Sequence, residues 1–358
     1  MMKIAYDAKR YYHNHTGLGN YSRALVTGQQ RYYPDEEYVL YDEKALSRTF
    51  KMGHTAKREG CDLLHGLSNE LPLNIRKAKI TCLVTMHDVA WRTYPDMYHW
   101  ADRQIYDLKY GLSCRQASHV LAISESTKRD VMNFYDVPER RITVIYQPVQ
   151  ELFYTPLSDD ESQQILDQAL WQKQLGDALP NDFILNVGSI NSRKNLLGLV
   201  KALELIPADQ RPMLLVVGNG REYRREVEEY IARHGLTQYV RIESGVRDNR
   251  VLQALYARAS LMAYPSHYEG FGLPVVEVAL QRCPILTSDV SSLPEAAGPG
   301  ALLCHPSEVE SIREGLCELL DHRDVAENLA IEAEKYARHR FEPKRLAEQV
   351  HELYVQLI

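Results

Sequence analysis

Two carboxylates, Glu269 and Glu277, lie eight positions apart on either side of a short glycine-containing stretch. The apolar run before it, at 261–264, predicts a strand, and a second apolar run at 284–287 predicts another. Pro274 suits the first turn of a helix between them, because proline lacks an N–H that the helix leaves unpaired there. A strand, glycine loop, helix and strand in this order place a positive helix end at the mouth of a parallel sheet, which suits a phosphate group. The alternative is one surface acid and one acid stabilised by the helix dipole.

Two adjacent cations, Arg193 and Lys194, follow an apolar run at 183–187 and Gly188. Sequence neighbours cannot share one helix face. In a loop, however, both can converge on a diphosphate, which Arg binds bidentately and Lys contacts as a point charge. The alternative is a solvated surface pair. The chain contains no D-x-D pair that would hold a divalent metal, so we expect these cations to supply the positive charge.

His87 directly follows an apolar run, at the expected carboxyl end of a strand, where the ligands of parallel sheets collect. A histidine hydrogen-bonded at a strand end explains it equally well. Gly17 and Gly19 belong to a polar loop expected between a first strand at 3–8 and a helix at 21–32. A glycine-rich turn in that place can bind phosphate, and a plain tight turn explains it as well.

Length and composition indicate a globular protein of two domains. The chain has 358 residues, of which 45% are hydrophobic and 25% charged. Residues 1–150 hold 21 basic against 17 acidic residues, and the remainder holds 21 against 31. The positive first half fits an anionic membrane surface or a phosphate-bearing acceptor, and scattered solvated charges explain it as well. No nucleic-acid partner is expected.

The six cysteines form no C-x2-C pair, so we expect reduced core residues rather than metal ligands or disulfides. The chain enters a strand pattern directly, without a signal peptide, and contains no run of 18 apolar residues. These features predict a cytoplasmic protein. Peripheral contact with the inner face of the membrane through the N-terminal domain is a further expectation.

Short apolar runs alternate with helical segments along the chain, which predicts parallel sheets covered on both faces. Prolines flank a polar segment at 156–181, so we expect an N-terminal domain at 1–155, this connector, and a C-terminal domain at 182–341. Residues 342–358 predict an amphipathic helix. Its apolar face comprises Leu346, Val350, Leu353 and Leu357. The expected fold class is α/β, with two Rossmann-like domains whose parallel sheets face a central cleft.

The residues E-G-F-G-L-P-V-V-E at 269–277 resemble the E-x7-E signature of retaining, nucleotide-sugar-dependent glycosyltransferases of family four, also called glycosyl transferases group 1. The resemblance covers essentially the full length. It is strong at 183–305 and weaker at 1–150, where the acceptor would bind, and it is greatest to bacterial mannosyltransferases of polysaccharide assembly. It implies the GT-B fold, in which the final helix crosses back onto the first domain.

The resemblance also implies a role for each residue of the site. Glu277 would bind the nucleotide ribose, Glu269 the donor sugar, and Val246 would lie beside the base, while His87 would approach from the opposite domain. The catalytic residues would be His87, Arg193, Lys194 and Glu269. The donor-binding residues would be Gly17, Gly19, Gly188, Gly218, Val246, Gly270, Phe271, Gly272, Leu273, Pro274 and Glu277. No metal and no other cofactor is expected, since the nucleotide sugar is a co-substrate.

We therefore expect a retaining, metal-independent hexosyltransferase that moves a sugar from a nucleotide-sugar donor to a glycan or lipid-linked acceptor in lipopolysaccharide or related cell-surface polysaccharide synthesis. GDP-mannose is the first expectation for the donor, and UDP-sugars stay open. One alternative is a GT-B-fold sugar-nucleotide epimerase, which turns over the donor without an acceptor. A second is a non-catalytic nucleotide-sugar-binding protein. A two-domain dehydrogenase would need G-x-G-x-x-G after its first strand, and neither half shows that pattern.

Overall fold

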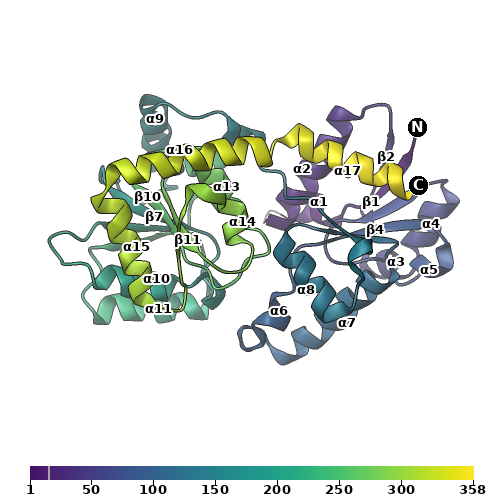
Figure 1. Cartoon of the computed structure of the whole chain (residues 1–358), viewed down its shortest axis with the longest axis horizontal. Helices are drawn as coiled ribbons and strands as arrows, with labels where there is room; N and C mark the ends of the chain where they lie inside the picture. The colour runs from purple at the N-terminus through teal and green to yellow at the C-terminus, as the bar shows by residue number, and fades with distance from the viewer. Residues whose placement is uncertain (15–16) are drawn as a thin grey trace. The chain divides into compact units, whose positions relative to one another are not determined.

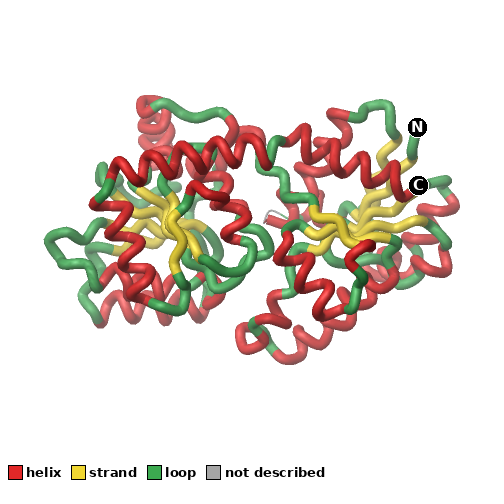
Figure 2. The backbone as a smooth tube through the Cα atoms, viewed as in Figure 1, coloured by secondary structure: helices red, strands yellow, loops and turns green. Residues whose placement is uncertain are grey.

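The computed structural model describes residues 1–14 and 17–358, which divide into two compact units. Unit 1 comprises Met1–Gln150 and Phe341–Ile358, and unit 2 comprises Glu151–Arg340. Each unit is built on a six-stranded parallel sheet with helices on both faces (Figure 1, Figure 2). The predicted α/β class with two Rossmann-like domains is therefore confirmed.

The sheet of unit 1 has the strand order β2-β1-β3-β4-β5-β6, with every neighbouring pair parallel. Its strands are β1 (Lys3–Asp7), β2 (Glu37–Tyr41), β3 (Leu63–Gly66), β4 (Thr81–Met86), β5 (His119–Ala122) and β6 (Ile142–Val144). The central strands are buried apolar runs, as expected of strands covered on both faces. Asp7 ends β1 and His87 directly follows β4, so both residues lie at the carboxyl edge of this sheet.

Helices surround this sheet. They are α1 (Lys9–His13), α2 (Gly17–Tyr32), α3 (Ala45–Phe50), α4 (Met52–Arg58), α5 (Ile75–Ala78), α6 (Ala90–Thr93), η1 (Pro95–Met97), α7 (Trp100–Gln116), α8 (Glu125–Tyr135), η2 (Glu139–Arg141) and α17 (Pro343–Leu357). The helices expected at 21–32 and 342–358 correspond to α2 and α17. The short helices α3 to α6 have too few turns for a periodic apolar pattern to identify them.

The segment between β1 and α2 differs from the predicted glycine loop. Gly17 and Gly19 both lie inside α2. Gly19 is buried, and a Cβ there would lie 1.8 Å from the carbonyl oxygen of Asn14, so this glycine permits close backbone packing rather than a turn. The loop prediction was therefore wrong for these two residues, whereas His15 and Thr16 lie outside the described part of the chain.

The tail helix α17 belongs to unit 1 and lies beside α2 (Figure 1). Of the apolar face predicted for it, Leu346, Val350 and Leu353 are buried and Leu357 is half-buried. The Gln29 amide in α2 also donates a hydrogen bond to the carbonyl of Ala347, with a donor–acceptor distance of 2.7 Å. The last helix therefore completes the core of the unit that begins with the first strand.

Tyr354 of α17 joins a buried chain of hydrogen bonds in unit 1. Its Oη lies 2.7 Å from Nδ1 of His65 and donates to Oη of Tyr6 at 3.2 Å. Nε2 of His65 lies 2.8 Å from Oγ1 of Thr85, which lies 3.0 Å from Oη of Tyr21. Burial lowers the pKa of His65 to about 3, so its ring is neutral at pH 7 and the chain consists of uncharged groups.

Replacing Tyr354 with phenylalanine should lower the free energy of unfolding of unit 1 by about 1–3 kcal/mol, because the ring stays while His65 Nδ1 and Tyr6 Oη lose a partner. Urea unfolding followed by far-UV circular dichroism measures the change. Val355→Ala is the control, since Val355 is the exposed neighbour on the same helix. An unchanged midpoint for Tyr354→Phe would show that the network does not hold α17.

The sheet of unit 2 has the order β12-β11-β10-β7-β8-β9, again parallel throughout. Its strands are β7 (Phe183–Val187), β8 (Met213–Val217), β9 (Val240–Glu243), β10 (Leu261–Tyr264), β11 (Ile285–Ser288) and β12 (Leu302–Cys304). Its helices are η3 (Glu151–Tyr154), α9 (Asp159–Trp171), η4 (Ser192–Lys194), α10 (Leu196–Glu204), α11 (Glu222–Arg233), α12 (Asn249–Arg258), α13 (Leu273–Ala279), α14 (Leu293–Ala297), η5 (Gly298–Gly300), α15 (Val309–Asp321) and α16 (Arg323–Arg340).

Residues 156–181, expected as a connector between domains, belong to unit 2, which begins at Glu151. Their helix α9 packs against α12. The side chain of Gln253 in α12 donates to the carbonyl oxygens of Leu152 and Thr155, at 2.9 Å and 2.6 Å. A capping box at Ser158 begins α9. This segment is polar because one face of α9 is exposed, while the other face is part of the unit.

No helix within residues 1–14 and 17–358 is both long enough and apolar enough to cross a bilayer.

Candidate functional site

The strand, glycine loop, helix and strand predicted around Glu269 are confirmed as β10, a loop, α13 and β11. Gly272 has a φ of 106°, and a Cβ there would lie 2.8 Å from Cδ2 of Leu293, so both its conformation and its packing require glycine. Pro274 lies in the first turn of α13, as predicted. Because α13 has only seven residues, its dipole is small, and most positive charge near this loop must come from side chains.

Ser292, which is not part of this loop, fixes its conformation through hydrogen bonds. Its Oγ lies 2.8 Å from the carbonyl oxygen of Glu269 and 2.9 Å from that of Phe271, so one hydroxyl bridges the two residues on either side of Gly270. Phe271 is buried. The loop is therefore fixed in place by its packing and by a residue that precedes α14.

Glu269 receives hydrogen bonds from three side chains of unit 2. Its carboxylate lies 2.9 Å from Nη1 of Arg193, 2.5 Å from Nζ of Lys194 and 3.1 Å from Oη of Tyr264. Glu269 is 7% exposed, while the two cations are partly buried. The two cations converge, as predicted, and they do so on the Glu269 carboxylate. The cluster of two cations and one anion carries a net charge of one positive.

This cluster changes the protonation of Glu269. Burial alone would raise the pKa of its carboxyl group, but Lys194 and Arg193 outweigh burial and lower the pKa to about 2. Glu269 is therefore ionised throughout the physiological range. A buried carboxylate between two cations can position both of them for an incoming anion.

Two asparagines position the cations. Asn191 precedes η4, and its side chain accepts a hydrogen bond from the backbone N–H of Lys194 at 3.3 Å. Asn195 follows η4 in the left-handed conformation, and its Nδ2 donates to the carbonyl oxygens of Pro265 and Pro306 at 3.1 Å and 2.7 Å. These bonds tie the turn after β7 to the segments that follow β10 and β12. Arg193 also donates to the carbonyl of Tyr268, which joins the turn to the loop before α13.

Glu277, the second carboxylate of the motif, has a different environment. It is half-buried in the second turn of α13, and its Oε2 accepts a hydrogen bond from Oη of Tyr256 at 3.0 Å. Burial raises its pKa to about 7, and the Tyr256 hydrogen bond only partly opposes that shift. The two glutamates of one motif thus have pKa values displaced in opposite directions, which is typical of functional sites.

A cavity of about 330 Å³ lies at the carboxyl ends of β7, β8 and β9. It brings together three of the predicted donor-binding residues, Gly188, Gly218 and Val246. A Cβ at Gly218 would lie 1.8 Å from the carbonyl oxygen of Gly188, so glycine is required there. A Cβ at Gly188 would lie 3.6 Å from Cε of Lys194, so the lysine stem passes beside this cavity.

His87 lies at the end of β4 in unit 1, where the sequence places it, and is 3% exposed. Its Nε2 lies 2.9 Å from the carbonyl oxygen of Leu67, so Nε2 carries the proton, and the Gln147 amide donates to Nδ1 at 2.9 Å. Burial lowers the pKa of His87 to about 4, partly opposed by the Leu67 hydrogen bond. The ring is therefore neutral and held by two bonds, and its approach to a donor stays a prediction.

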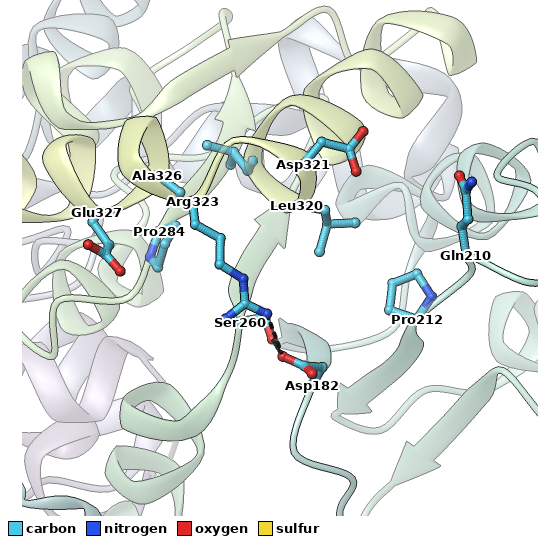
Figure 3. A pocket seen from close by; sticks show the side chains of 11 residues that line it. Asp182, Gln210, Pro212, Ser260, Pro284, Leu320, Asp321, Arg323, Ala326 and Glu327 are labelled. Carbon is cyan, nitrogen blue, oxygen red and sulfur yellow. Dashed lines mark hydrogen bonds and ion pairs between the residues drawn. The ribbon is translucent and has the colours of Figure 1, made fainter.

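A larger cavity of about 400 Å³ lies at the other edge of the unit 2 sheet. It is lined by residues that directly precede strands, among them Asp182, Pro212, Ser260 and Pro284 (Figure 3). Arg323 and Ser260 both bond to Asp182 there, with distances of 3.3 Å. Ligands of open parallel sheets bind outside the carboxyl ends of the strands, so the edge that holds Gly188 and Lys194 is the candidate site.

The sequence did not predict the roles of several side chains at the carboxyl edge of the unit 2 sheet. Tyr264 and Tyr256 bond to the two glutamates, and Asn195 and Ser292 fix the surrounding turns. The position of Tyr264 as the last residue of a strand was a usable signal, because strand ends line such sites. The other three act through contacts that join distant segments, for which the sequence holds no local signal.

Two parallel-sheet units with this carboxyl-edge site define the class of GT-B glycosyltransferases. Residues 14–151 match the family described as Glycosyltransferase Family 4, and residues 167–338 match the family Glycosyl transferases group 1. The chain therefore belongs to the family 4, group 1 glycosyltransferases, as the signature at 269–277 predicts.

Its relatives include mannosyltransferases. It is 30% identical to the O-antigen chain mannosyltransferase B of Escherichia coli over 255 residues, which is 70% of this chain and 63% of that protein. It is 33% identical to the serotype-specific mannosyltransferase WbdA of Escherichia coli over 201 residues, or 55% of this chain and 24% of WbdA. It is 25% identical to the O-antigen chain mannosyltransferase RfbU of Salmonella typhimurium over 228 residues. The chain spans less than two thirds of the length of each of these relatives.

Solved structures share the fold. Sucrose-phosphate synthase from Thermosynechococcus elongatus matches with a TM-score of 0.80 and 19% identity, covering 100% of this chain and 99% of that one. Anabaena HepE, in complex with UDP and glucose, matches with a TM-score of 0.74 and 17% identity over the whole of both chains. At these identities the likeness establishes the GT-B fold alone.

Proposed function

We propose that this protein is a retaining glycosyltransferase that transfers mannose from GDP-mannose to a glycan or lipid-linked acceptor in cell-surface polysaccharide synthesis. The observation that carries the proposal is the cluster of Arg193, Lys194 and Glu269 beside the cavity at Gly188. Its excess positive charge suits a diphosphate. The mannosyltransferase relatives support the choice of sugar.

In this proposal each residue of the cluster acts on the departing nucleoside diphosphate or on the sugar. Arg193 and Lys194 neutralise the charge that grows on the diphosphate as the bond to the sugar breaks. Glu269 holds the two cations in place and faces the donor sugar. Glu277 accepts hydrogen bonds from the ribose hydroxyl groups. A leaving phosphate oxygen takes the proton of the acceptor hydroxyl, so no protein nucleophile and no metal ion is needed.

Sugar nucleotides tested for thermal stabilisation should identify the donor. A ligand at 100 times its dissociation constant adds about 2.7 kcal/mol to the stability of the fold that binds it. We expect GDP-mannose and GDP to raise the melting temperature more than UDP-glucose and UDP do. A stronger effect of the UDP compounds would contradict the donor assignment, and no effect of any sugar nucleotide would contradict the function. Consumption of donor without an acceptor would instead indicate the epimerase.

Replacing Glu277 with alanine should weaken GDP-mannose binding roughly 10-fold or more, because a charged hydrogen-bond acceptor for the ribose is lost. Calorimetric titration measures the affinity. The fold should remain intact, because relief of the unfavourable burial of the ionised carboxylate, shown by the raised pKa, opposes the loss of the hydrogen bond from Tyr256. Glu222→Ala is the matched control, because Glu222 is an exposed acid in the first turn of α11. Unchanged donor affinity for Glu277→Ala would remove the ribose assignment.

A further inference from the structure

The ring of His87 lies where three segments of unit 1 converge, and both of its nitrogens have partners in the protein. Nε2 donates to the carbonyl oxygen of Leu67 at 2.9 Å, and the amide of Gln147 donates to Nδ1 at 2.9 Å. Leu67 follows β3, His87 follows β4 and Gln147 comes after β6, so the three residues meet at the carboxyl edge of one sheet. Gln147 is 6% exposed, and its contact with the ring links the last strand of this sheet to His87.

The backbone of His87 is held separately from its ring. Its N–H donates to Oδ1 of Asn69 at 2.7 Å, and its carbonyl oxygen accepts from Oγ1 of Thr127 at 3.1 Å. Asn69 is buried and has a φ of 61°, a left-handed conformation that asparagine tolerates better than most residues. The N–H of Asn69 also donates to the carbonyl oxygen of Thr85 in β4, at 2.8 Å. The backbone position of His87 is therefore fixed without Gln147.

Tyr21 packs against the ring of His87 and limits its movement. The two rings are nearly perpendicular, at 88°, with their centroids 4.7 Å apart. Oη of Tyr21 lies 3.0 Å from Oγ1 of Thr85, so this tyrosine is itself held by the buried hydrogen-bond network of unit 1. An aromatic contact does not distinguish a ring nitrogen from a ring carbon, whereas a hydrogen bond does. The choice of which ring atoms face which partners therefore depends on Leu67 and Gln147.

The surroundings of the His87 ring keep it neutral. Burial is the main cause of its low pKa of about 4; the hydrogen bond to Leu67 opposes this effect and the charge of Arg10 in α1 adds to it. His65 of β3, which interacts electrostatically with His87, is also neutral, with a pKa of about 3. A neutral ring that donates from Nε2 must accept at Nδ1. A glutamine completes this arrangement, because its amide donates a hydrogen bond and brings no charge.

We propose that Gln147 is a positioning residue of the transfer reaction, which acts by holding the ring of His87 in one orientation with Nδ1 as its acceptor nitrogen. It does so on the basis of the proposed function and of the expected approach of His87 to the donor. A substrate hydroxyl at Nδ1 can then bind only as a hydrogen-bond donor. Without Gln147, Nδ1 is buried without a partner and the ring can turn, so fewer encounters have the productive geometry.

Three variants of the full-length chain separate positioning from folding. Gln147→Met keeps the length of the side chain and removes the donor. Gln147→Glu replaces the amide with a carboxylate that only accepts, so both ring nitrogens of His87 then face acceptors. Gln29→Met is the matched control, because Gln29 is a buried glutamine of the same unit whose amide donates to the carbonyl oxygen of Ala347 instead.

The protonation of His87 is measured from ¹H–¹⁵N correlation spectra of its ring at neutral pH, with the signals assigned by their loss in His87→Ala. The wild type should show a proton on Nε2 alone. Gln147→Glu should show protons on both nitrogens, because a carboxylate beside the ring favours its charged form. Gln29→Met should give the wild-type pattern. Unchanged His87 signals in Gln147→Glu would show that Gln147 does not act on the ring, and this result would overturn the proposal.

Turnover tests the same contact. Gln147→Met should lower the rate of sugar transfer at saturating donor roughly 10- to 100-fold with little change in the KM for the donor, whereas Gln29→Met should transfer at close to the wild-type rate. Once His87 is alanine, Gln147→Met should cause no further loss, because Gln147 acts through that ring.

The same loss from Gln147→Met in the His87→Ala background, or an equal loss for Gln29→Met, would show a merely structural role and overturn the proposal. A wild-type chain that transfers no sugar would contradict the proposed function itself. A transferring enzyme whose rate is unchanged in Gln147→Met would contradict the role of Gln147 alone.

Discussion

Replacing Lys194 with alanine should lower the rate of sugar transfer about 10²- to 10³-fold while donor affinity falls much less. Charge grows on the diphosphate as the transition state forms, so a cation aimed at it contributes more to turnover than to ground-state binding. The side chain of Lys194 is 14% exposed and bonds to Glu269 and Tyr264, so its ammonium group is held in position before a donor arrives. Release of nucleoside diphosphate, measured at saturating donor, gives the rate.

The matched control is Lys201→Ala, which removes the same charge from α10 in the same unit. Arg193→Ala should lower turnover comparably and also weaken donor binding, because Arg193 additionally bonds to the carbonyl of Tyr268 and so holds the loop before α13. Lys194→Arg should recover part of the rate, since the charge is kept while its geometry changes. If Lys194→Ala and Arg193→Ala both retain normal turnover, the diphosphate binds elsewhere.

Replacing Glu269 with glutamine should reduce the stability of unit 2 at neutral pH and flatten its dependence on pH in the acid range. The folded pKa of about 2 lies below the ordinary value of 4.5. The ionised carboxylate therefore stabilises the fold above about pH 4.5, and this stabilisation is lost as the pH falls toward 2. The displacement corresponds to on the order of 3 kcal/mol. Glutamine also leaves Arg193 and Lys194 partly buried without a counter-charge.

Guanidinium unfolding of the variant and the wild type between pH 7 and pH 3 tests this expectation. The difference in unfolding free energy should be largest at pH 7 and should shrink as the pH falls. Glu222→Gln serves as the control, because that acid is exposed in α11. Stability curves that run parallel for Glu269→Gln and the wild type would show that the cluster does not lower the pKa of this carboxyl group.

Glu277 should show the reverse dependence. Its folded pKa of about 7 lies above the ordinary value of 4.5. The protonated Glu277 side chain therefore stabilises the fold fully below about pH 4.5, and this stabilisation is lost as the pH rises through about 7. Glu277→Gln should therefore raise stability most above pH 7. The same motif thus contains one carboxylate that is charged at neutral pH and one whose charge depends on pH near neutrality.

The sequence by itself determined the class of the fold and the place of the candidate site. Buried parallel strands are continuous apolar runs, and helices have their own period, so both can be recognised locally. The strand from Leu261 to Tyr264, the first-turn position of Pro274 and the apolar face of α17 all depend on such local patterns. The glycine at the end of the loop could also be interpreted from the local sequence, because Gly272 needs a backbone conformation that other residues rarely adopt.

Only the tertiary structure decided how those residues act on one another. Arg193 and Glu269 are separated by 76 positions, and they meet because β7 and β10 are neighbours in the sheet of unit 2. That neighbour relation places Glu269 between two cations, and the packing of α12 against α13 places Glu277 beside Tyr256. Two chemically identical side chains therefore acquire opposite pKa displacements. Burial and the distance between charges determine a pKa. Both quantities depend on which distant segments pack together, and a local pattern of residues does not contain that information.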